Sequence, residues 1–279
     1  KATPPAATKP KKNNLKEGNA LEAQPQSPEA QRASFRVPEG FEVELVASEE
    51  TGVPKPVSLA FDDAGRLWTQ TATAYPRDRD PKIWEKPGPD RIVIIDQPHL
   101  AEPQPARVFA SGMVMPMSIL PWGNGAIVAQ GPEILRLEDT DNDGLADKRT
   151  VLIKGFGVQD THTLPHQLVR LPGQQIGFSQ GVLNGGTITD ASGKKHPFDK
   201  TLIASFAPDG TDLQILGVGM NNIWAWAEDR LGRVFIHEAN DWGYSLVPFE
   251  RDSTYPSFVS SSIHPDAPIH PPTAQDLGL

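Results

Sequence analysis

Residues 59–68 read Leu-Ala-Phe-Asp-Asp-Ala-Gly-Arg-Leu-Trp, which places a short apolar strand on each side of a turn centred on Gly65. The same unit recurs three times, with turns centred on Gly123, Gly173 and Gly232, so that successive glycines lie 58, 50 and 59 residues apart. Further apolar strands follow each pair. A four-stranded unit repeated at about 50 residues is typical of a β-propeller, because one blade cannot bury both of its faces alone. We therefore predict an all-β fold, a β-propeller with about four blades in this chain.

Composition divides the chain into an arm and a part that carries the blades. Residues 1–33 are rich in Pro, Ala, Lys and Gln and contain almost no large apolar residue, which predicts a flexible arm. Residues 34–279 are expected to form the propeller, beginning with a strand at residues 41–46, where apolar and acidic residues alternate. After Asp252 the sequence shows no pattern for a closing strand. Further blades or another protein chain are therefore expected to complete the ring.

Several classes of protein are excluded by composition. The net charge is −9, and no basic block lies outside the arm, so we expect no nucleic-acid binding, which needs a positive face. The absence of cysteine excludes disulfides, thiolate metal ligands, iron–sulfur clusters and covalently attached haem. No apolar run reaches the length of about 18 residues that a membrane-spanning helix needs. The chain begins with Lys1 rather than Met, which suggests a processed or trimmed start. The expected location is periplasmic or extracellular.

An acidic loop at residues 139–147 reads Asp-Thr-Asp-Asn-Asp-Gly-Leu-Ala-Asp. Carboxylates at alternate positions of a tight loop offer the hard oxygen ligands that Ca²⁺ prefers, and Gly144 permits the bend. The loop is not a complete EF-hand, because Thr150 stands where a bidentate Glu is needed and no helices flank it. The alternative is a polar hairpin whose Asp-Gly pair supplies the turn. The predicted calcium ligands, with a structural rather than a catalytic role, are Asp139, Asp141, Asp143 and Asp147.

Two histidines, His162 and His166, lie in the loop that leads into the third repeat. Loops between blades can face the mouth of a propeller's central channel, where an imidazole could accept a proton from a substrate hydroxyl near neutral pH. Their spacing on an extended loop is no metal-binding signature. A structural hydrogen-bonding role is the alternative for each of them.

Polar residues also gather on both sides of the fourth repeat. Residues 219–222 read Gly-Met-Asn-Asn, and residues 237–243 read His-Glu-Ala-Asn-Asp-Trp-Gly where a strand leaves for a loop. Such clusters at strand ends suit a ligand or a metal, and tight turns held by side-chain hydrogen bonds are the alternative. The candidate cofactor-binding residues are Asn221, Asn222, Glu238, Asn240 and Asp241.

Three stretches carry a resemblance to a known family, namely residues 35–41 (Phe-Arg-Val-Pro-Glu-Gly-Phe), 59–68 and 137–149. Taken in order, they resemble the six-bladed propellers of the soluble quinoprotein glucose/sorbosone dehydrogenase superfamily. Within that superfamily, the chain looks like the propellers of the membrane-bound dehydrogenase type that is abundant in planctomycetes. The resemblance extends over residues 34–279 and implies six blades when the ring is complete.

The resemblance also implies a mechanism. In the quinoprotein enzymes a histidine at the channel mouth is the general base, PQQ (pyrroloquinoline quinone) accepts hydride, and calcium holds the quinone. The stretch that begins at His166 is similar to the one that carries this base, so His166 is the first candidate and His162 the second. Residues 219–222 resemble the family's Gly-x-Arg-Asn element, whose Arg contacts the quinone. Here Asn221 takes that position, and the loss of a permanent cation weakens the case for PQQ.

Two hypotheses of function follow. The first is an exported oxidoreductase that oxidises a sugar or related alcohol at the channel mouth, with PQQ as hydride acceptor and a c-type cytochrome receiving the electrons. The second is a non-catalytic propeller that acts as a binding module or as an architectural subunit of an exported or membrane-attached complex. The mouth histidines and the resemblance favour the enzyme, whereas Asn221 and the open ring favour the second hypothesis.

Overall fold

The computed structural model describes residues 26–76, 81–100, 102–199, 201–220, 222–238 and 247–254, in two units that comprise residues 1–45 and 46–279. In the first unit Pro28–Ser34 form helix α1, at whose start Ser27 Oγ accepts a hydrogen bond from the N–H of Ala30 at 3.2 Å. The end of the predicted flexible arm is therefore helical. The predicted strand at residues 41–46 is wrong: these residues form no strand, and Phe41 is 71% exposed. Alternation yields a strand only where another strand pairs with it.

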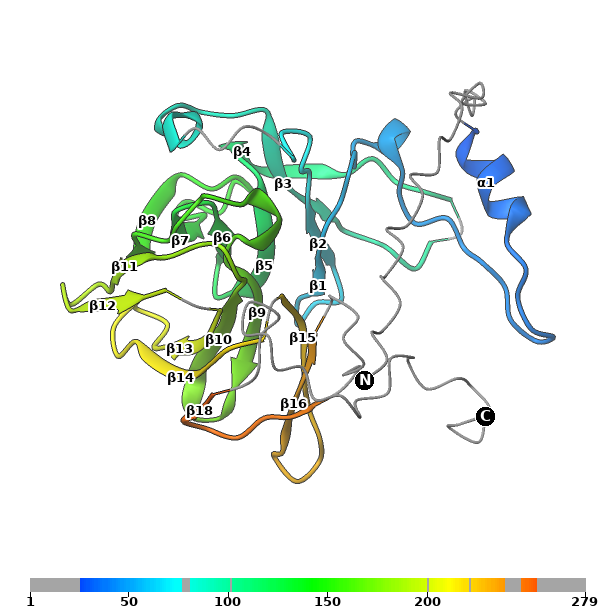
Figure 1. The fold of residues 1–279 in the computed structure, drawn as a ribbon. Coiled ribbons are helices and arrows are strands. Elements are labelled where there is room, and N and C mark those ends of the chain that lie inside the picture. Colours follow the sequence, from blue (N-terminus) through cyan, green and yellow to red (C-terminus); the bar gives the residue numbers. More distant parts are fainter. Residues whose placement is uncertain are drawn as a thin grey trace, which may run out of the picture. The chain divides into compact units, whose positions relative to one another are not determined.

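Antiparallel sheets follow one another along the second unit, which confirms the predicted propeller blades (Figure 1). Blade 1 pairs its strands in sequence order, and they are β1 (Leu59–Phe61), β2 (Leu67–Gln70), β3 (Asp90–Ile95) and β4 (Arg107–Met113). Blade 2 repeats this order with β5 (Pro116–Trp122), β6 (Gly125–Gln130), β7 (Glu133–Glu138) and β8 (Lys148–Lys154).

Blades 3 and 4 follow the same plan. Blade 3 contains β9 (His166–Leu171), β10 (Gln175–Gln180), β13 (Leu202–Phe206) and β14 (Gln214–Val218), and β18 (Ser253–Thr254) pairs with β14 in parallel. The described strands of blade 4 are β15 (Ile223–Glu228), β16 (Val234–Glu238) and β17 (Val247–Pro248). Short 3-10 helices are η1 (Glu49–Thr51), η2 (Pro81–Glu85), η3 (Thr161–Thr163) and η4 (Pro172–Gln174). None of the helices in the described ranges is both long and apolar enough to cross a bilayer.

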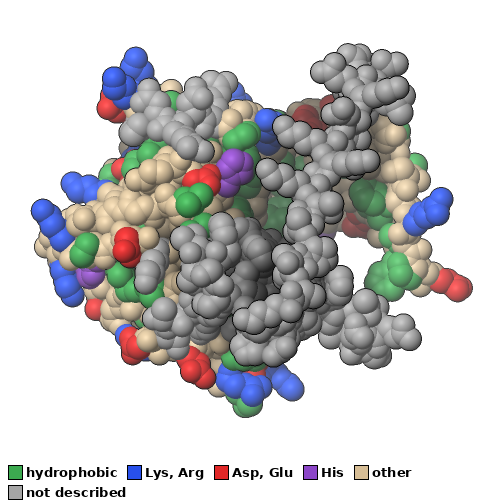
Figure 2. All heavy atoms as spheres, viewed as in Figure 1, with side chains coloured by type: hydrophobic (Ala, Val, Ile, Leu, Met, Phe, Trp, Pro, Cys, Tyr) green, Lys and Arg blue, Asp and Glu red, His purple; other side chains and the backbone are tan. Residues whose placement is uncertain are grey.

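A hairpin between β10 and β13 leaves its own blade. Its strands, β11 (Gly186–Thr189) and β12 (Lys195–Phe198), join the outer edge of blade 2, where Thr189 is paired with Lys154 of β8. The free edge is then β12, next to which Lys194 and Lys195 are exposed. Figure 2 shows Lys and Arg side chains gathered on this side of the molecule, at the left. Lysines and Pro197 on an edge strand oppose its pairing with another chain.

The predicted glycine turns join the first two strands of each blade. In all four the glycine has a positive φ, which favours Gly: 78°, 59°, 73° and 76° for Gly65, Gly123, Gly173 and Gly232. In blade 1, Asp62 Oδ1 accepts from the backbone N–H groups of Ala64 and Arg66, both at 3.0 Å, and Asp229 makes the same pair of contacts in blade 4. Local hydrogen bonding by Asp therefore fixes the hairpin before any blade packs on another.

Apolar side chains hold neighbouring blades face to face. β5 contacts β1 and β2, β9 contacts β5 and β6, and β15 contacts β9 and β10. One apolar cluster joins blade 1 to blade 2 and includes Trp68 and Val128, both buried. A second cluster joins blade 2 to blade 3 and includes Ile134 and Phe178, and a third joins blades 3 and 4. Each such side chain contributes about 1.5–3 kcal/mol when fully buried, so these interfaces are the core of the protein.

The sheets have two ends with different connections. The four glycine turns and the β7–β8 loop lie at one end, which we name the turn end, because antiparallel strands bring alternate connections together. The segments that enter β9 and leave β10 lie at the other end, the mouth end. Near the end of β9, Arg170 Nη2 donates to the carbonyl oxygen of Pro121, near the end of β5, at 2.7 Å. Corresponding ends of neighbouring blades therefore lie together.

Blade 1 leaves part of one face exposed. Leu59 and Phe61 are 66% and 61% exposed, and the strand register puts them on the same face as Val93 and Ile95. Val53 packs on Val93 and Ile95, so the outer part of this face is covered. Within the described ranges no blade covers the inner part. An apolar strand face of this kind is a site for association.

We predict that replacing Leu59 and Phe61 together by Ser reduces self-association of the protein. Sedimentation velocity at micromolar concentration should show the unaltered chain as associated species and the double variant shifted toward monomer. The melting temperature should change little, because both side chains are already exposed. Leu231→Ser, at a turn where Leu231 is 78% exposed, is the matched control and should not alter association. A monodisperse, cooperatively melting monomer of the unaltered chain would show that the face is covered.

Candidate functional site

Six polar or aromatic side chains from three segments meet at the mouth end. One lies in the β2–β3 connection, three in the segment before β9, and two at or after the end of β10. We name this group the mouth cluster, and its members are Tyr75, Asp160, His162, Thr163, Gln180 and Asn184.

Asp160 and His162 form a carboxylate–imidazole pair within the mouth cluster. Asp160 Oδ1 lies 2.9 Å from the backbone nitrogen of His162 and 2.8 Å from its Nδ1. An ionised carboxylate can only accept, so the proton of the neutral imidazole sits on Nδ1 and the lone pair on Nε2. The side chain of His162 is 62% exposed and that of Asp160 is 20% exposed. This is the arrangement of a base whose orientation is set by a second group.

Asn184 and Gln180 hold the loop that carries this pair. The Asp160 N–H donates to Asn184 Oδ1 at 2.7 Å, and Asn184 Nδ2 donates back to the Asp160 carbonyl oxygen at 2.8 Å. Gln180 Nε2 donates to the carbonyl oxygen of Thr163, and Thr163 Oγ1 donates to that of Val182 at 2.7 Å. Buried amides thus fix the backbone on both sides of His162, so little ordering is needed before the imidazole can act.

Tyr75 lies beside the Asp160–His162 pair and contacts the imidazole. Its ring meets that of His162 edge to face, with centroids 5.6 Å apart. Burial and the nearby charge of Asp160 raise the pKa of Tyr75 above its usual value. The phenol therefore stays protonated at neutral pH and is available as a hydrogen-bond donor.

His166, the first candidate base, is fully buried. Its Nδ1 lies 2.5 Å from the carbonyl oxygen of Leu164, its Nε2 lies 2.5 Å from that of Ile223, and its ring stacks on Trp224 with centroids 4.4 Å apart. Both ring nitrogens thus face backbone oxygens rather than solvent. In this arrangement His166 ties the entry to blade 3 to the first strand of blade 4.

We predict that His166 makes the protein less stable in acid. Burial lowers the pKa of His166 below the usual value of about 6.5 for histidine, against an opposing effect of the two carbonyl contacts. At acidic pH the unfolded chain therefore binds more protons than the folded protein does. The contribution of neutral His166 to the free energy of unfolding should be fully present above about pH 6.5 and should be lost as the pH falls below that value. The loss should be about 1.4 kcal/mol for each pH unit by which the folded-state pKa lies below the unfolded-state pKa. Urea unfolding at about pH 8 and about pH 5 measures this difference.

One variant assigns the effect to this side chain. His166→Phe keeps a ring on Trp224 but cannot titrate, so it should be less stable at all pH values and less sensitive to acid. An equal pH dependence in His166→Phe and the unaltered chain would contradict the assignment.

The structure describes only some of the candidate cofactor-binding residues. Asn222 is 8% exposed and lies beside the mouth cluster: a Cβ added to Gly181 would be 3.0 Å from Asn222 Oδ1 and 2.5 Å from Thr163 Cβ. Glu238 ends β16, and its side chain lies outside the described residues. The remaining three candidates, Asn221, Asn240 and Asp241, also lie outside them.

Sequence reasoning missed Asp160, Tyr75, Gln180 and Asn184 as members of a site. A signal for Gln180 was present, because the second strand of three successive blades ends in a buried glutamine: Gln70, Gln130 and Gln180. Each glutamine bonds to the segment that enters its own blade, through Ser58, Val114 and Thr163 respectively.

The acidic loop lies at the turn end, between β7 and β8. Carboxylate oxygens of Asp139, Asp141 and Asp147 all lie within 4.8 Å of one another, which fits a single divalent cation. Asp143 stands outside this group, and its Oδ1 accepts from the N–H of Leu145 at 2.8 Å. The loop is far from the mouth histidines along the sheets, so an ion here would hold the hairpin rather than take part in chemistry at the mouth.

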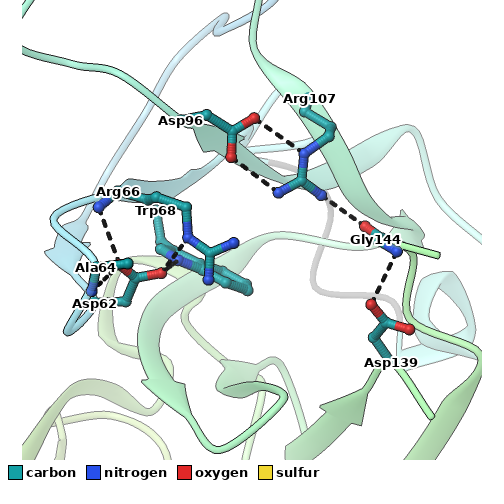
Figure 3. A network of polar contacts seen from close by, with 8 residues as sticks. All are labelled: Asp62, Ala64, Arg66, Trp68, Asp96, Arg107, Asp139 and Gly144. Atoms are coloured by element: carbon teal, nitrogen blue, oxygen red, sulfur yellow. Dashed lines mark hydrogen bonds and ion pairs between the residues drawn. The ribbon is translucent and has the colours of Figure 1, made fainter. Parts of the chain in front are cut away.

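Arg107 of blade 1 binds the same loop (Figure 3). Its Nη1 donates to the carbonyl oxygen of Gly144 at 2.7 Å, and the Gly144 N–H donates to Asp139 Oδ2 at 2.9 Å. Asp96 holds the guanidinium from the other side, with Oδ1 3.0 Å from Nη2. The hydrogen bonds of Asp96 raise the pKa of Arg107, which keeps it charged. Blade 1 therefore fixes the loop that carries the carboxylates.

We predict that Asp141→Ala lowers the melting temperature in calcium but changes it little in EDTA. The reason is that a ligand bound by the folded state alone stabilises it, so loss of a ligand matters only when the ion is supplied. Thermal unfolding with each addition is the measurement. Asp209→Ala, in the turn between β13 and β14 where Asp209 Oδ1 accepts from Thr211, should shift both temperatures equally. Equal shifts for Asp141→Ala would make the acidic loop an ordinary turn.

The stacked antiparallel sheets define a β-propeller protein. The chain belongs to the family described as Domain of unknown function (DUF7133), which matches residues 27–270. A comparison with curated proteins finds no match.

Among solved structures, the chain is similar to PQQ-bound aldose sugar dehydrogenase from Streptomyces coelicolor, with 14% identity and a TM-score of 0.47. It is also similar to the pyranose dehydrogenase PQQ domain from Coprinopsis cinerea, with 17% identity and a TM-score of 0.40. These alignments cover 73% and 72% of this chain but 62% and 47% of those chains, so this chain spans less than two thirds of either. Virginiamycin B lyase from Staphylococcus aureus matches with 11% identity and a TM-score of 0.38, over 70% of this chain and 69% of that one.

Proposed function

We propose that the protein is an exported propeller oxidoreductase that oxidises a sugar or related alcohol at its mouth end. The observation that carries this proposal is the Asp160–His162 pair, in which Asp160 Oδ1 contacts His162 Nδ1 at 2.8 Å and the His162 side chain is 62% exposed. His162 is favoured over His166 as the base, because His166 is buried with both nitrogens against carbonyl oxygens. In the reaction His162 takes the hydroxyl proton, and Asp160 stabilises the imidazolium that forms.

Tyr75 and the rigid loop complete the role of the mouth cluster. A protonated phenol beside the imidazole can donate to a second oxygen of a polyol, which orients the hydroxyl that loses its proton. Tyr75 itself packs against a buried apolar cluster that includes Val158, Leu164 and Met115.

Oxidation also needs an acceptor for the hydride. The resemblance implies PQQ, with a c-type cytochrome receiving the electrons. PQQ carries carboxylates and needs cations, yet no arginine is hydrogen-bonded or ion-paired to the mouth cluster in the described part of the chain. The cation found there is Lys55, whose Nζ lies 3.5 Å from the carbonyl oxygen of Tyr75. These described residues do not fit an anionic quinone. The hydride of the proposed reaction therefore passes to a separate two-electron acceptor that is not part of this chain, and the assay below supplies a dye in that role.

We predict that His162→Gln lowers kcat/KM for alcohol oxidation by about 100-fold or more, as expected for loss of a general base. The assay is dye-linked oxidation of a panel of sugars and polyols, with and without added PQQ and Ca²⁺. Asp160→Asn should also lower the rate, because an amide no longer fixes the imidazole proton on Nδ1. Absence of turnover by the unaltered, calcium-loaded protein with every acceptor would refute the proposal.

His196→Gln is the matched control for these variants. His196 also faces a carboxylate, with its Nε2 3.5 Å from Asp190 Oδ2, but it lies in the β11–β12 hairpin on blade 2. Its replacement should leave kcat/KM unchanged. A loss of activity as large as that of His162→Gln would mean that the assay reports stability rather than chemistry at the mouth.

A non-catalytic role is the second candidate, and the exposed strand face with Leu59 and Phe61 favours it. In that role the propeller would bind another protein chain as a subunit of an exported or membrane-attached complex. Stoichiometric co-purification of a partner that is lost in the Leu59 and Phe61 double variant would support it. A monomer with turnover would exclude it. The periplasmic or extracellular location rests on the family resemblance and belongs to both candidates.

A further inference from the structure

A cavity of about 460 Å³ opens at the turn end, on the opposite side of the sheets from the mouth cluster. Its volume lies within the range of about 300–1,000 Å³ that is usual for small-molecule sites. Three blades contribute to it. Blade 1 provides the β1–β2 turn, β2 and β4, blade 2 provides the β5–β6 turn and the acidic β7–β8 loop, and blade 3 provides β9. The side chains that give it chemical character are Trp68, Phe109, Trp122, Arg66, Arg107 and Arg170.

The arginines of this cavity differ in how far they are neutralised. Arg66 Nε is paired with Asp62 Oδ2 at 2.7 Å, and Figure 3 shows its outer nitrogens turned away from Asp62. Arg107 is held by Asp96 and the Gly144 carbonyl oxygen. Arg170 lies over the Trp122 ring at 4.3 Å and donates to the Pro121 carbonyl oxygen, and none of the described carboxylates is ion-paired with it. The cavity therefore presents a guanidinium without an acidic partner.

The acidic residues of the lining are largely occupied. Asp62 accepts from Trp68 Nε1 at 2.8 Å as well as from Arg66. Asp139 accepts from two backbone N–H groups of its own loop. Asp63 is exposed at the tip of the turn, where solvent screens its charge. Inside the cavity, more guanidinium N–H groups than carboxylate oxygens therefore remain available to bind a ligand.

We propose that this turn-end cavity binds a small carboxylic acid with an apolar body. The carboxylate is held by Arg66 and Arg170, whose planar N–H groups match its two oxygens. The apolar body lies against the side chains of Trp68, Phe109 and Trp122. This site is independent of the proposed oxidoreductase activity, because it shares no residue with the mouth cluster.

Blade 4 supplies an internal comparison for the role of Arg66. The turn of blade 4 repeats the same ion pair, with Arg233 Nε 2.6 Å from Asp229 Oδ2. Phe235 stands there where blade 1 has Trp68, and Arg233 does not line the cavity. The Asp–Arg turn is thus a structural element of the fold, and what distinguishes blade 1 is the cavity beside it.

The test uses benzoate as the acid and benzamide as its neutral counterpart of the same shape. Calorimetric titration of the full chain should give saturable binding of benzoate that weakens as salt is added, and benzamide should bind about tenfold more weakly or worse. Arg170→Gln and Arg66→Gln should each weaken benzoate binding by about tenfold or more, with little change for benzamide. Arg233→Gln and His162→Gln should bind benzoate as the unaltered chain does.

Arg170→Lys keeps the inference testable if Arg170→Gln fails to fold. It retains the positive charge but not the planar fork, so it should bind benzoate more weakly than the unaltered chain does, with little change for benzamide. Absence of saturable benzoate binding, equal binding of benzamide, or full benzoate affinity in folded Arg170→Gln or Arg170→Lys would each overturn the proposal. Because His162→Gln abolishes the proposed activity alone, failure of the oxidoreductase proposal leaves this result unaffected.

Discussion

The stacking of sheets that are apolar on both faces is the constraint on which the rest of the structure depends. It is clearest in β6, where every residue is buried. Ala126 and Val128 pack toward blade 1, whereas Ile127 and Ala129 pack toward blade 3. Because successive side chains of a strand point to opposite faces, an uninterrupted apolar run serves two interfaces at once. A blade without a neighbour on one side loses half of this burial, as Leu59 and Phe61 of blade 1 show.

Burial on both faces makes a polar group without a partner costly, and most polar side chains inside the described blades are hydrogen-bonded, although Gln180 Oε1 is an exception. Asp90 is fully buried, and its oxygens accept from the N–H groups of Thr73 at 2.6 Å and Met115 at 2.9 Å. It thereby joins two mouth-end connections that flank blade 1. The glutamines that end β2, β6 and β10 likewise form hydrogen bonds to connecting segments, but each does so within its own blade. Unpaired groups at these positions would each cost about 1–3 kcal/mol.

These fixed connections explain how the Asp160–His162 pair can lie on a loop and still be held in place. The segment that carries Asp160 and His162 is held by Asn184 and Gln180, and both of these belong to the next part of blade 3. The turn end has a different chemistry, with ion pairs between Asp and Arg, the acidic loop and an open cavity. Since the strands separate the two ends, a ligand at one end does not compete with chemistry at the other.

The repeat, the glycine turns and the number of blades could be predicted from the sequence, because they depend on local rules. A positive φ requires Gly65 or its equivalents wherever the first hairpin of a blade turns, and strand alternation reports burial without knowledge of the neighbour. The Asp160–His162 contact is equally local, since the two residues are two positions apart. The carboxylates of the acidic loop are local as well, although the structure brings Asp139, Asp141 and Asp147 together and leaves Asp143 outside.

Only the tertiary structure decided how the two mouth histidines differ. His166 is buried because Trp224 and the Ile223 carbonyl oxygen reach it from the next blade, whereas His162 stays exposed in its short 3-10 turn. The transfer of β11 and β12 to blade 2, and the failure of residues 41–46 to form a strand, have the same origin. Each depends on a partner distant in sequence, and neither residue type nor spacing records whether that partner is present.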